Sequence, residues 1–187
     1  IDTYEVVVEQ ELGEHFKASA AGYLYYVNDL IDQVTDGSFL VYRNLEQVRG
    51  RGIELELSGR FAHGVRGRLS YCLQETEDLG SHQRLSNSPE HLLQGGVSVP
   101  VYTDKVFASA NVRYISARTS AVGADVPPYF LLDLTLFSHR WVNGLELSAS
   151  IYNVFDRRIL EPAPLELRQP LLEQDGRSYQ VKLQYRF

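Results

Sequence analysis

The residues of this sequence that could support catalysis are few, and their spacing does not assemble a catalytic site. Glu54 and Glu56 are two carboxylates of the kind that general acid–base catalysis uses. Two positions apart on an extended strand, they lie on one face in equivalent surroundings, which sets neither apart as the acid. The sequence also contains no glycine-rich phosphate loop and no serine nucleophile elbow. We therefore expect that the protein is not an enzyme.

Metal and cofactor chemistry is equally poorly supported. His91 could be a ligand, but a lone histidine is usually a hydrogen-bonding group, and His15, His63, His82 and His139 show no ligand spacing. The single Cys72 excludes an internal disulfide framework and argues against a thiolate cluster. A net charge of -6 disfavours a nucleic-acid partner. We expect no cofactor, no metal and no nucleic acid.

The strongest pattern is the alternation of apolar and polar residues, which identifies the elements. Side chains of a strand point alternately to its two faces. In residues 178–187 one face therefore carries Tyr179, Val181, Leu183, Tyr185 and Phe187, and the other is polar. Such a strand suits either a soluble sheet with one wet face or the wall of a membrane barrel.

Similar segments recur along the chain and predict an all-β fold, an antiparallel up-and-down meander of about nine strands. The expected strands are residues 3–12, 16–31, 39–61 with a bulge near 50–52, 65–74, 91–102, 105–118, 129–140, 145–155 and 178–187. Tight turns are expected at 13–14, 63–64, 103–104 and 143–144, and loops at 32–38, 75–90, 118–128 and 156–176. Short and long links thus alternate, as in outer-membrane barrels, with long loops outside.

The polar alternates are then expected to face a wet barrel interior. They include Glu54, Glu56, Arg60, Arg66, Arg68 and Asp133. Pairing between neighbouring strands would offset the charges.

Four stretches resemble the C-terminal half of a TonB-dependent outer-membrane receptor, in that family's order. They are RGIELELSGR at 51–60 with Gly52 and Glu54, NSPEH at 87–91 with Asn87, Pro89 and His91, SIYNVFDRR at 150–158 with Asn153, Phe155 and Asp156, and GRSYQVKLQYRF at 176–187. The resemblance spans essentially all of residues 1–187.

The resemblance implies a 22-stranded barrel of the bacterial outer membrane, with a plug domain in its lumen. Residues 1–187 would then be the C-terminal part of that barrel, and the plug and the earlier strands would lie outside this sequence, which has no methionine and begins at Ile1. The family takes up scarce ligands, using the proton gradient through the TonB complex, and an iron–siderophore complex is the expected ligand. Haem, cobalamin and glycans are other ligands of the family.

The same resemblance suggests roles and partners. Phe187 and the alternate apolar residues before it resemble the signal that the barrel-assembly machinery reads, since an aromatic-ended edge strand can add to another sheet. Asn153 and Asp156 are expected to satisfy backbone groups where a strand ends, with Phe155 near the membrane interface. Pro89 suits a strand entrance, where no ladder donor is needed. Outer-membrane lipid is the remaining expected partner, and the four long loops are where ligand contacts would lie.

Two other classes stay open on the sequence alone. One is a self-contained outer-membrane barrel of about eight strands acting as an adhesin or anchor, which requires the sheet to close. The other is a soluble all-β carbohydrate-binding module. That class requires Leu55, Leu132, Leu147 and Leu183 to be covered by a second sheet.

Overall fold

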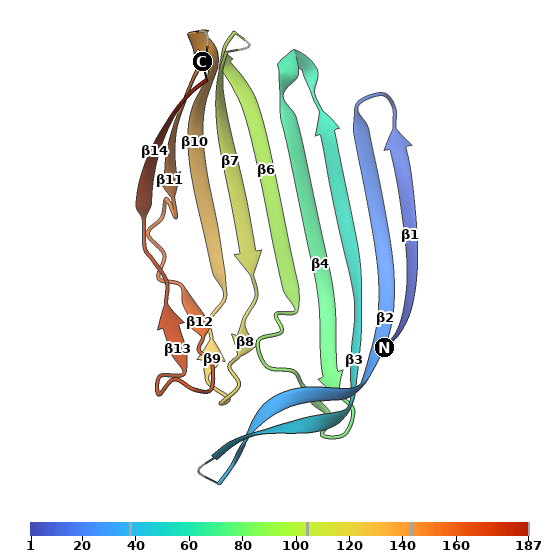
Figure 1. Ribbon diagram of the computed structural model, residues 1–187. Coiled ribbons are helices and arrows are strands. Elements are labelled where there is room, and N and C mark those ends of the chain that lie inside the picture. The colour runs from blue at the N-terminus through green and yellow to red at the C-terminus, as the bar shows by residue number, and fades with distance from the viewer. Residues whose placement is uncertain (38, 104, 143, 187) are drawn as a thin grey trace.

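Nine long strands form one antiparallel meander in the computed structural model, which describes residues 1–37, 39–103, 105–142 and 144–186. Their order in the sheet is their order in the chain: β1 (Asp2–Leu12), β2 (Phe16–Asp36), β3 (Phe39–Arg60), β4 (Arg66–Asp78), β6 (His91–Tyr102), β7 (Val106–Ile115), β10 (Tyr129–Val142), β11 (Leu145–Tyr152) and β14 (Ser178–Tyr185). Figure 1 shows these strands side by side. The predicted meander of nine strands is confirmed.

Five short strands and one turn of 3₁₀ helix complete the described structure. The helix η1 (Ala62–Gly64) joins β3 to β4, where a tight turn was predicted. β5 (Gln83–Arg84) pairs with the end of β4. β8 (Arg118–Thr119) pairs with β9 (Asp125–Val126), and β12 (Leu160–Pro162) pairs with β13 (Leu171–Glu173), so two predicted loops contain small hairpins.

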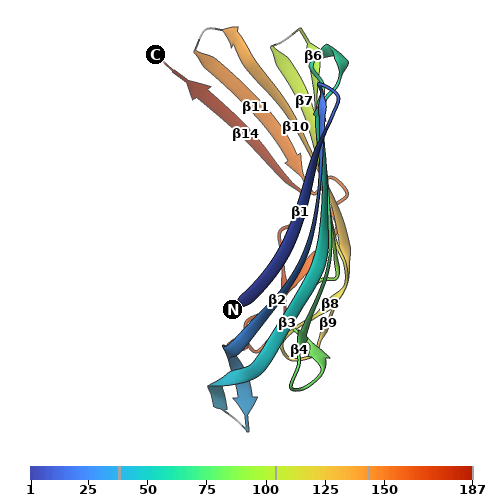
Figure 2. The same cartoon turned by 90° about the vertical axis from the view of Figure 1, so that its right-hand side faces the viewer.

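The sheet is a single curved layer with edges at β1 and β14 (Figure 2). β1 pairs with β2 and β14 pairs with β11, and among the described residues no ladder joins the two edges. The count of nine strands and the open sheet both disagree with a self-contained barrel of eight strands.

One face of this layer is apolar and uncovered. The register places Ala20, Leu55 and Tyr71 side by side on β2, β3 and β4, and Leu136, Ala149 and Val181 side by side on β10, β11 and β14. On this face Leu55 is 47% exposed, Leu147 46% and Leu183 67%. Among the described residues no second sheet packs over them, so the hypothesis of a soluble sandwich is wrong. Such an exposed face is what hydrocarbon would cover in a membrane barrel.

Buried apolar side chains are correspondingly few among the described residues. They are Val48, Val106, Val126, Ile159 and Ala163, and three of them belong to the long loops. No helix in the described part of the chain has the length and hydropathy needed to cross a membrane.

The prediction of a loop at 32–38 is wrong. β2 continues to Asp36 and pairs with β3 as far as Asp36 and Phe39. Aspartate, threonine and glycine suggested a loop, but a hairpin that projects into water can carry polar residues on both faces. Ser38 itself lies outside the described residues, as do Asp104 and Asn143 in two of the predicted turns.

The outer part of this hairpin extends beyond the rest of the sheet. The β1 ladder on β2 ends at Tyr26, and the β4 ladder on β3 ends at Val48, so residues 28–47 form a two-stranded β2–β3 ribbon. Figure 1 shows it projecting past the neighbouring strands at the end of the molecule where the long loops lie.

The predicted bulge near residues 50–52 is also absent. Gly50 and Gly52 pair without a register shift with Tyr25 and Tyr23 on β2 and with β4 on the other side. The described register shifts lie elsewhere, between Pro100 and Tyr102 and between His139 and Val142.

Candidate functional site

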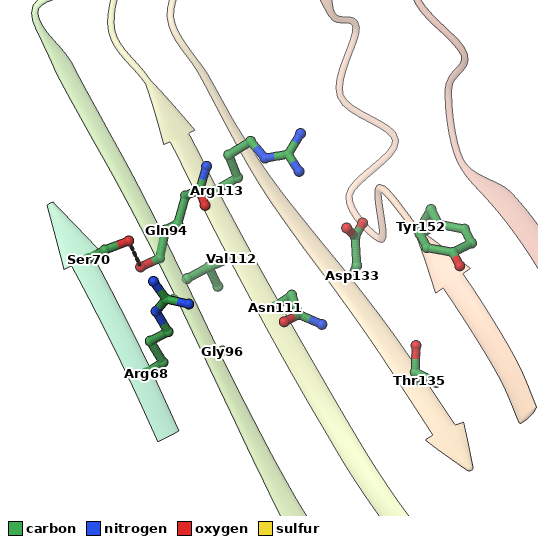
Figure 3. Close-up of a pocket in the computed structure, with 11 residues that line it drawn as sticks. Arg68, Ser70, Gln94, Gly96, Asn111, Val112, Arg113, Asp133, Thr135 and Tyr152 are labelled. Atoms are coloured by element: carbon green, nitrogen blue, oxygen red, sulfur yellow. Dashed lines mark hydrogen bonds between the residues drawn. The ribbon is translucent and has the colours of Figure 1, made fainter. Parts of the chain in front are cut away.

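The polar face of the sheet lies opposite the apolar one and carries charged and hydrogen-bonding side chains. A hollow of about 410 Å³ lies on it over β4, β6, β7, β10 and β11 (Figure 3). Its polar lining is Arg68, Ser70, Gln94, Asn111, Arg113, Asp133, Thr135 and Tyr152. All of these sit at alternate positions of their strands, so the two-residue period of the sequence builds the hollow directly.

Charges on this face are partly paired. Arg68 on β4 forms an ion pair with Glu56 on β3 at 2.7 Å, as predicted for neighbouring strands. Arg60 and Arg66 instead lie directly opposite each other. The Asp133 Oδ1 atom accepts a hydrogen bond from the backbone N–H of Asn153 at 2.8 Å, so this inward carboxylate also holds the end of β11.

Gly52 and Glu54 lie on the same polar face of β3. The Tyr23 ring covers Gly52 so closely that a Cβ at this position would stand 2.5 Å from the Tyr23 Oη atom. The Tyr25 ring covers Gly50 in the same way and stacks beside Tyr23 with centroids 6.2 Å apart. Gly50 and Gly52 therefore leave room for tyrosines of the adjacent strand to pack against β3.

Hydrogen bonds connect the NSPEH segment to β4 and to the residue that follows β7. The Ser116 Oγ atom accepts from the backbone N–H groups of Glu90 and His91, each at 3.0 Å. The Pro89 carbonyl accepts from the Gln74 side chain at 2.9 Å. His91 Nδ1 lies 2.8 Å from the Tyr71 hydroxyl, and no group of three possible metal ligands occurs in the part of the chain that the structure describes.

The SIYNVFDRR segment ends β11 with a network of local hydrogen bonds. Asn153 is 4% exposed, and its side chain exchanges two hydrogen bonds with the backbone of Arg157. The Asp156 carboxylate accepts from the backbone N–H of Arg177 at 2.8 Å. Both residues have a positive φ of 51°, a conformation that asparagine and aspartate tolerate well. Phe155 is exposed, with its ring centroid 6.4 Å from that of Phe130.

The C-terminal segment forms the edge strand β14. Tyr179, Val181, Leu183 and Tyr185 are all exposed on its apolar side. Phe187 lies outside the described residues.

Sequence reasoning missed a cluster around Arg118, whose side chain is only 3% exposed. Arg118 Nε donates to Asn87 Oδ1 at 2.9 Å, and its Nη2 pairs with the Glu161 carboxylate. The Tyr129 hydroxyl donates to Glu161 at 3.0 Å, beneath the guanidinium. These four residues are scattered between positions 87 and 161, so no spacing in the sequence signals that they meet.

Comparison with known proteins identifies the architecture. The family model described as TonB dependent receptor-like, beta-barrel, matches residues 1–154. The chain belongs to the TonB-dependent receptor family. Its members are transporters of the bacterial outer membrane, not enzymes. No curated protein sequence matches the chain.

Solved structures agree with the family assignment. The chain is similar to the ferric-catecholate import receptor Fiu from E. coli K12, with 20% identity, a TM-score of 0.78, and 99% of this chain and 27% of that chain covered. It is similar to the copper transporter OprC, with 18% identity, a TM-score of 0.82, and 99% and 31% covered.

A third structure, the siderophore receptor PiuA from Acinetobacter baumannii, has 19% identity, a TM-score of 0.77, and 98% and 28% covered. At these identities the likeness establishes the fold. The chain spans less than a third of the length of each of these three proteins.

Proposed function

We propose that residues 1–187 are the C-terminal barrel portion of a TonB-dependent receptor that imports an iron–siderophore complex across the bacterial outer membrane. The observation that carries this proposal is the two-faced open sheet. Its apolar face is uncovered, its polar face is hollowed, and its long loops gather at one end. A plug domain and the remaining strands, encoded before Ile1, would complete the transporter.

Each expected partner would meet a different part of this receptor. Outer-membrane lipid covers the apolar face, and the barrel-assembly machinery reads β14 and Phe187 during insertion. The TonB complex acts through the N-terminal part of the receptor. The ligand contacts the long loops and the part of the polar face nearest to them, because these would surround the entrance to the barrel.

Siderophore uptake is favoured over other cargo because two of the three similar structures reported above are iron or siderophore receptors. The similarity to a copper transporter supplies the competing cargo. The function of such relatives transfers only as a proposal, because site residues and not the fold determine the ligand.

Uptake of radioactive iron tests the proposal. A strain carrying the complete gene is compared with its deletion strain and with a TonB-deficient strain, using a panel of ferric siderophores under iron limitation. Accumulation that requires both the gene and TonB supports iron–siderophore import. TonB-dependent accumulation of copper, with no ferric siderophore taken up, would show that the proposed ligand is wrong and that the proposed transport function is right.

A further inference from the structure

Three long loops make contact with one another through buried groups, whereas loops between strands are usually exposed and independent. These are residues 79–90, 116–128 and 153–177, which follow β4, β7 and β11, and we call them the loop block. Within it, β9 lies against β12, and Figure 1 shows β8, β9, β12 and β13 gathered together. Val126, Ile159 and Ala163 are buried apolar residues of this block.

Arg118 is the polar centre of this block. Its guanidinium binds Asn87 from the first loop and Glu161 from the third, and it lies 6.0 Å from the ring centroid of Tyr129 at the start of β10. The backbone N–H of Asn87 also donates to the Thr119 carbonyl at 2.7 Å. One side chain thus connects all three loops.

The arrangement is not explained by stability alone. Burying an arginine is costly, and a buried ion pair is often no more stabilising than apolar residues in the same place. Arg118 Nη1 is buried and has no hydrogen-bond partner among the described residues, which adds to the cost. A buried group with such a cost is better explained by the fixed geometry that it imposes, since a guanidinium fork donates to its partners only in set directions.

We propose that Arg118 is a positioning residue that holds the three loops in one arrangement, so that they move as a single block. The β2–β3 ribbon touches this block at its base, where the backbone N–H of Leu79 donates to the Gln47 carbonyl at 2.8 Å, but Arg118 does not contact it. The functional consequence rests on the proposed uptake function: the three loops then approach or leave a ligand as one body.

Hydrogen exchange of the complete receptor, without ligand, tests the coupling. Replacing Arg118 with alanine should speed amide exchange in all three loops by roughly tenfold or more, because hydrogen bonds of a charged group are lost. R118K should not restore protection, because an ammonium cannot reproduce the two directed contacts. Acceleration confined to residues 116–128 would overturn the proposal.

Two further comparisons keep the test decisive. If R118A fails to fold, E161Q replaces it, because glutamine keeps the size of the side chain. E161Q should accelerate amide exchange in both the 116–128 and the 153–177 loops. Faster exchange in the 153–177 loop alone would count against the proposal. The control is R158A, which breaks the exposed 2.8 Å pair between Arg158 and Glu173 within one loop, and it should affect that loop only.

The double variant R118A/E161A should accelerate exchange by less than the product of the single effects, because the two residues act through one contact. A fully multiplicative result would contradict the proposed connection. Since no ligand is present, these outcomes are independent of the uptake experiment, which would identify a wrong cargo separately.

Discussion

Position 52 has no room for a Cβ atom, because the Tyr23 ring lies where that atom would be. An alanine Cβ there would stand 2.5 Å from the Tyr23 hydroxyl oxygen and 2.7 Å from the backbone oxygen of Leu73. The second contact is with backbone, so the tyrosine cannot relieve the clash by moving alone.

We therefore expect G52A to destabilise the barrel by roughly 1–3 kcal/mol, the usual cost of overpacking. The temperature at which the complete receptor loses its folded gel mobility measures the effect. G22A is the matched control, since a Cβ at Gly22 meets no heavy atom within 4 Å. Equal shifts for the two variants would show that the ring does not constrain Gly52.

Glu90 provides a pH-dependent contact in the 79–90 loop. The Arg84 guanidinium donates a hydrogen bond to this carboxylate at 2.7 Å, and the bond and charge together hold the pKa of Glu90 below its ordinary value of 4.5. A carboxyl whose pKa is lower in the folded state contributes stability above its ordinary pKa and loses it as the pH falls through the lower, folded-state value. The contribution is small, because the pair is exposed.

The expected result is a difference between wild type and E90Q that disappears in acid. Exchange of the 79–90 amides should be slower in wild type above pH 4.5, and the two proteins should converge as the pH falls below it. Comparing both proteins at the same pH removes the intrinsic pH dependence of exchange. A ratio that stays constant from pH 7 to pH 3 would contradict this assignment.

Single residues were predicted from the sequence only where a local pattern locates them. The positions of Glu56 and Arg68 on one polar face follow from the two-residue period of their strands. The Arg118 cluster could not be predicted, because Asn87, Arg118 and Glu161 come together only after three loops have folded. The role of Gly52 could not be predicted either, because the ring that covers it belongs to Tyr23 on another strand.

At the scale of the strand, consecutive residues of β2 lie on the polar and the apolar face of the sheet in turn. Ser19 lies on the polar face opposite Glu9 and Glu56, and Ala20 lies on the apolar face opposite Val8 and Leu55. The two positions are adjacent, both have small side chains, and they differ in the face on which they lie.

We expect A20R to impair insertion and S19R to be tolerated. Arginine on the lipid face near the bilayer midplane costs roughly 2–4 kcal/mol, whereas arginine at position 19 would meet two glutamates. The amount of folded receptor in outer-membrane fractions measures both. If S19R were the more damaging variant, the assignment of the two faces would be reversed.

The strands were predictable because alternation is repeated over many residues, and the sheet simply preserves it. The exceptions are the places where composition and pairing conflict. Residues 32–36 have the composition of a loop, yet the long ladder between β2 and β3 keeps them extended. The small hairpins β8–β9 and β12–β13 are too short for any period to show.

At the scale of the whole molecule, the described sheet has unpaired edges at β1 and β14 and few buried apolar side chains. Stability of the sheet must therefore come from what covers its apolar face and what pairs with β1 and β14. Residues 1–187 expressed alone should need detergent or self-associate, because exposed sheet edges template further pairing.

Sedimentation in the presence and absence of detergent tests this expectation. Adding detergent micelles should reduce aggregates to smaller, micelle-bound particles. A soluble monomer that binds no micelles would mean that the exposed leucines do not meet hydrocarbon.

The β2–β3 ribbon also bears on how such a receptor can diverge over time. Its strands bond to each other, so a pair of residues added or lost near the tip leaves every other ladder in register. The length of this projection can therefore change during evolution without disturbing the sheet that supports it.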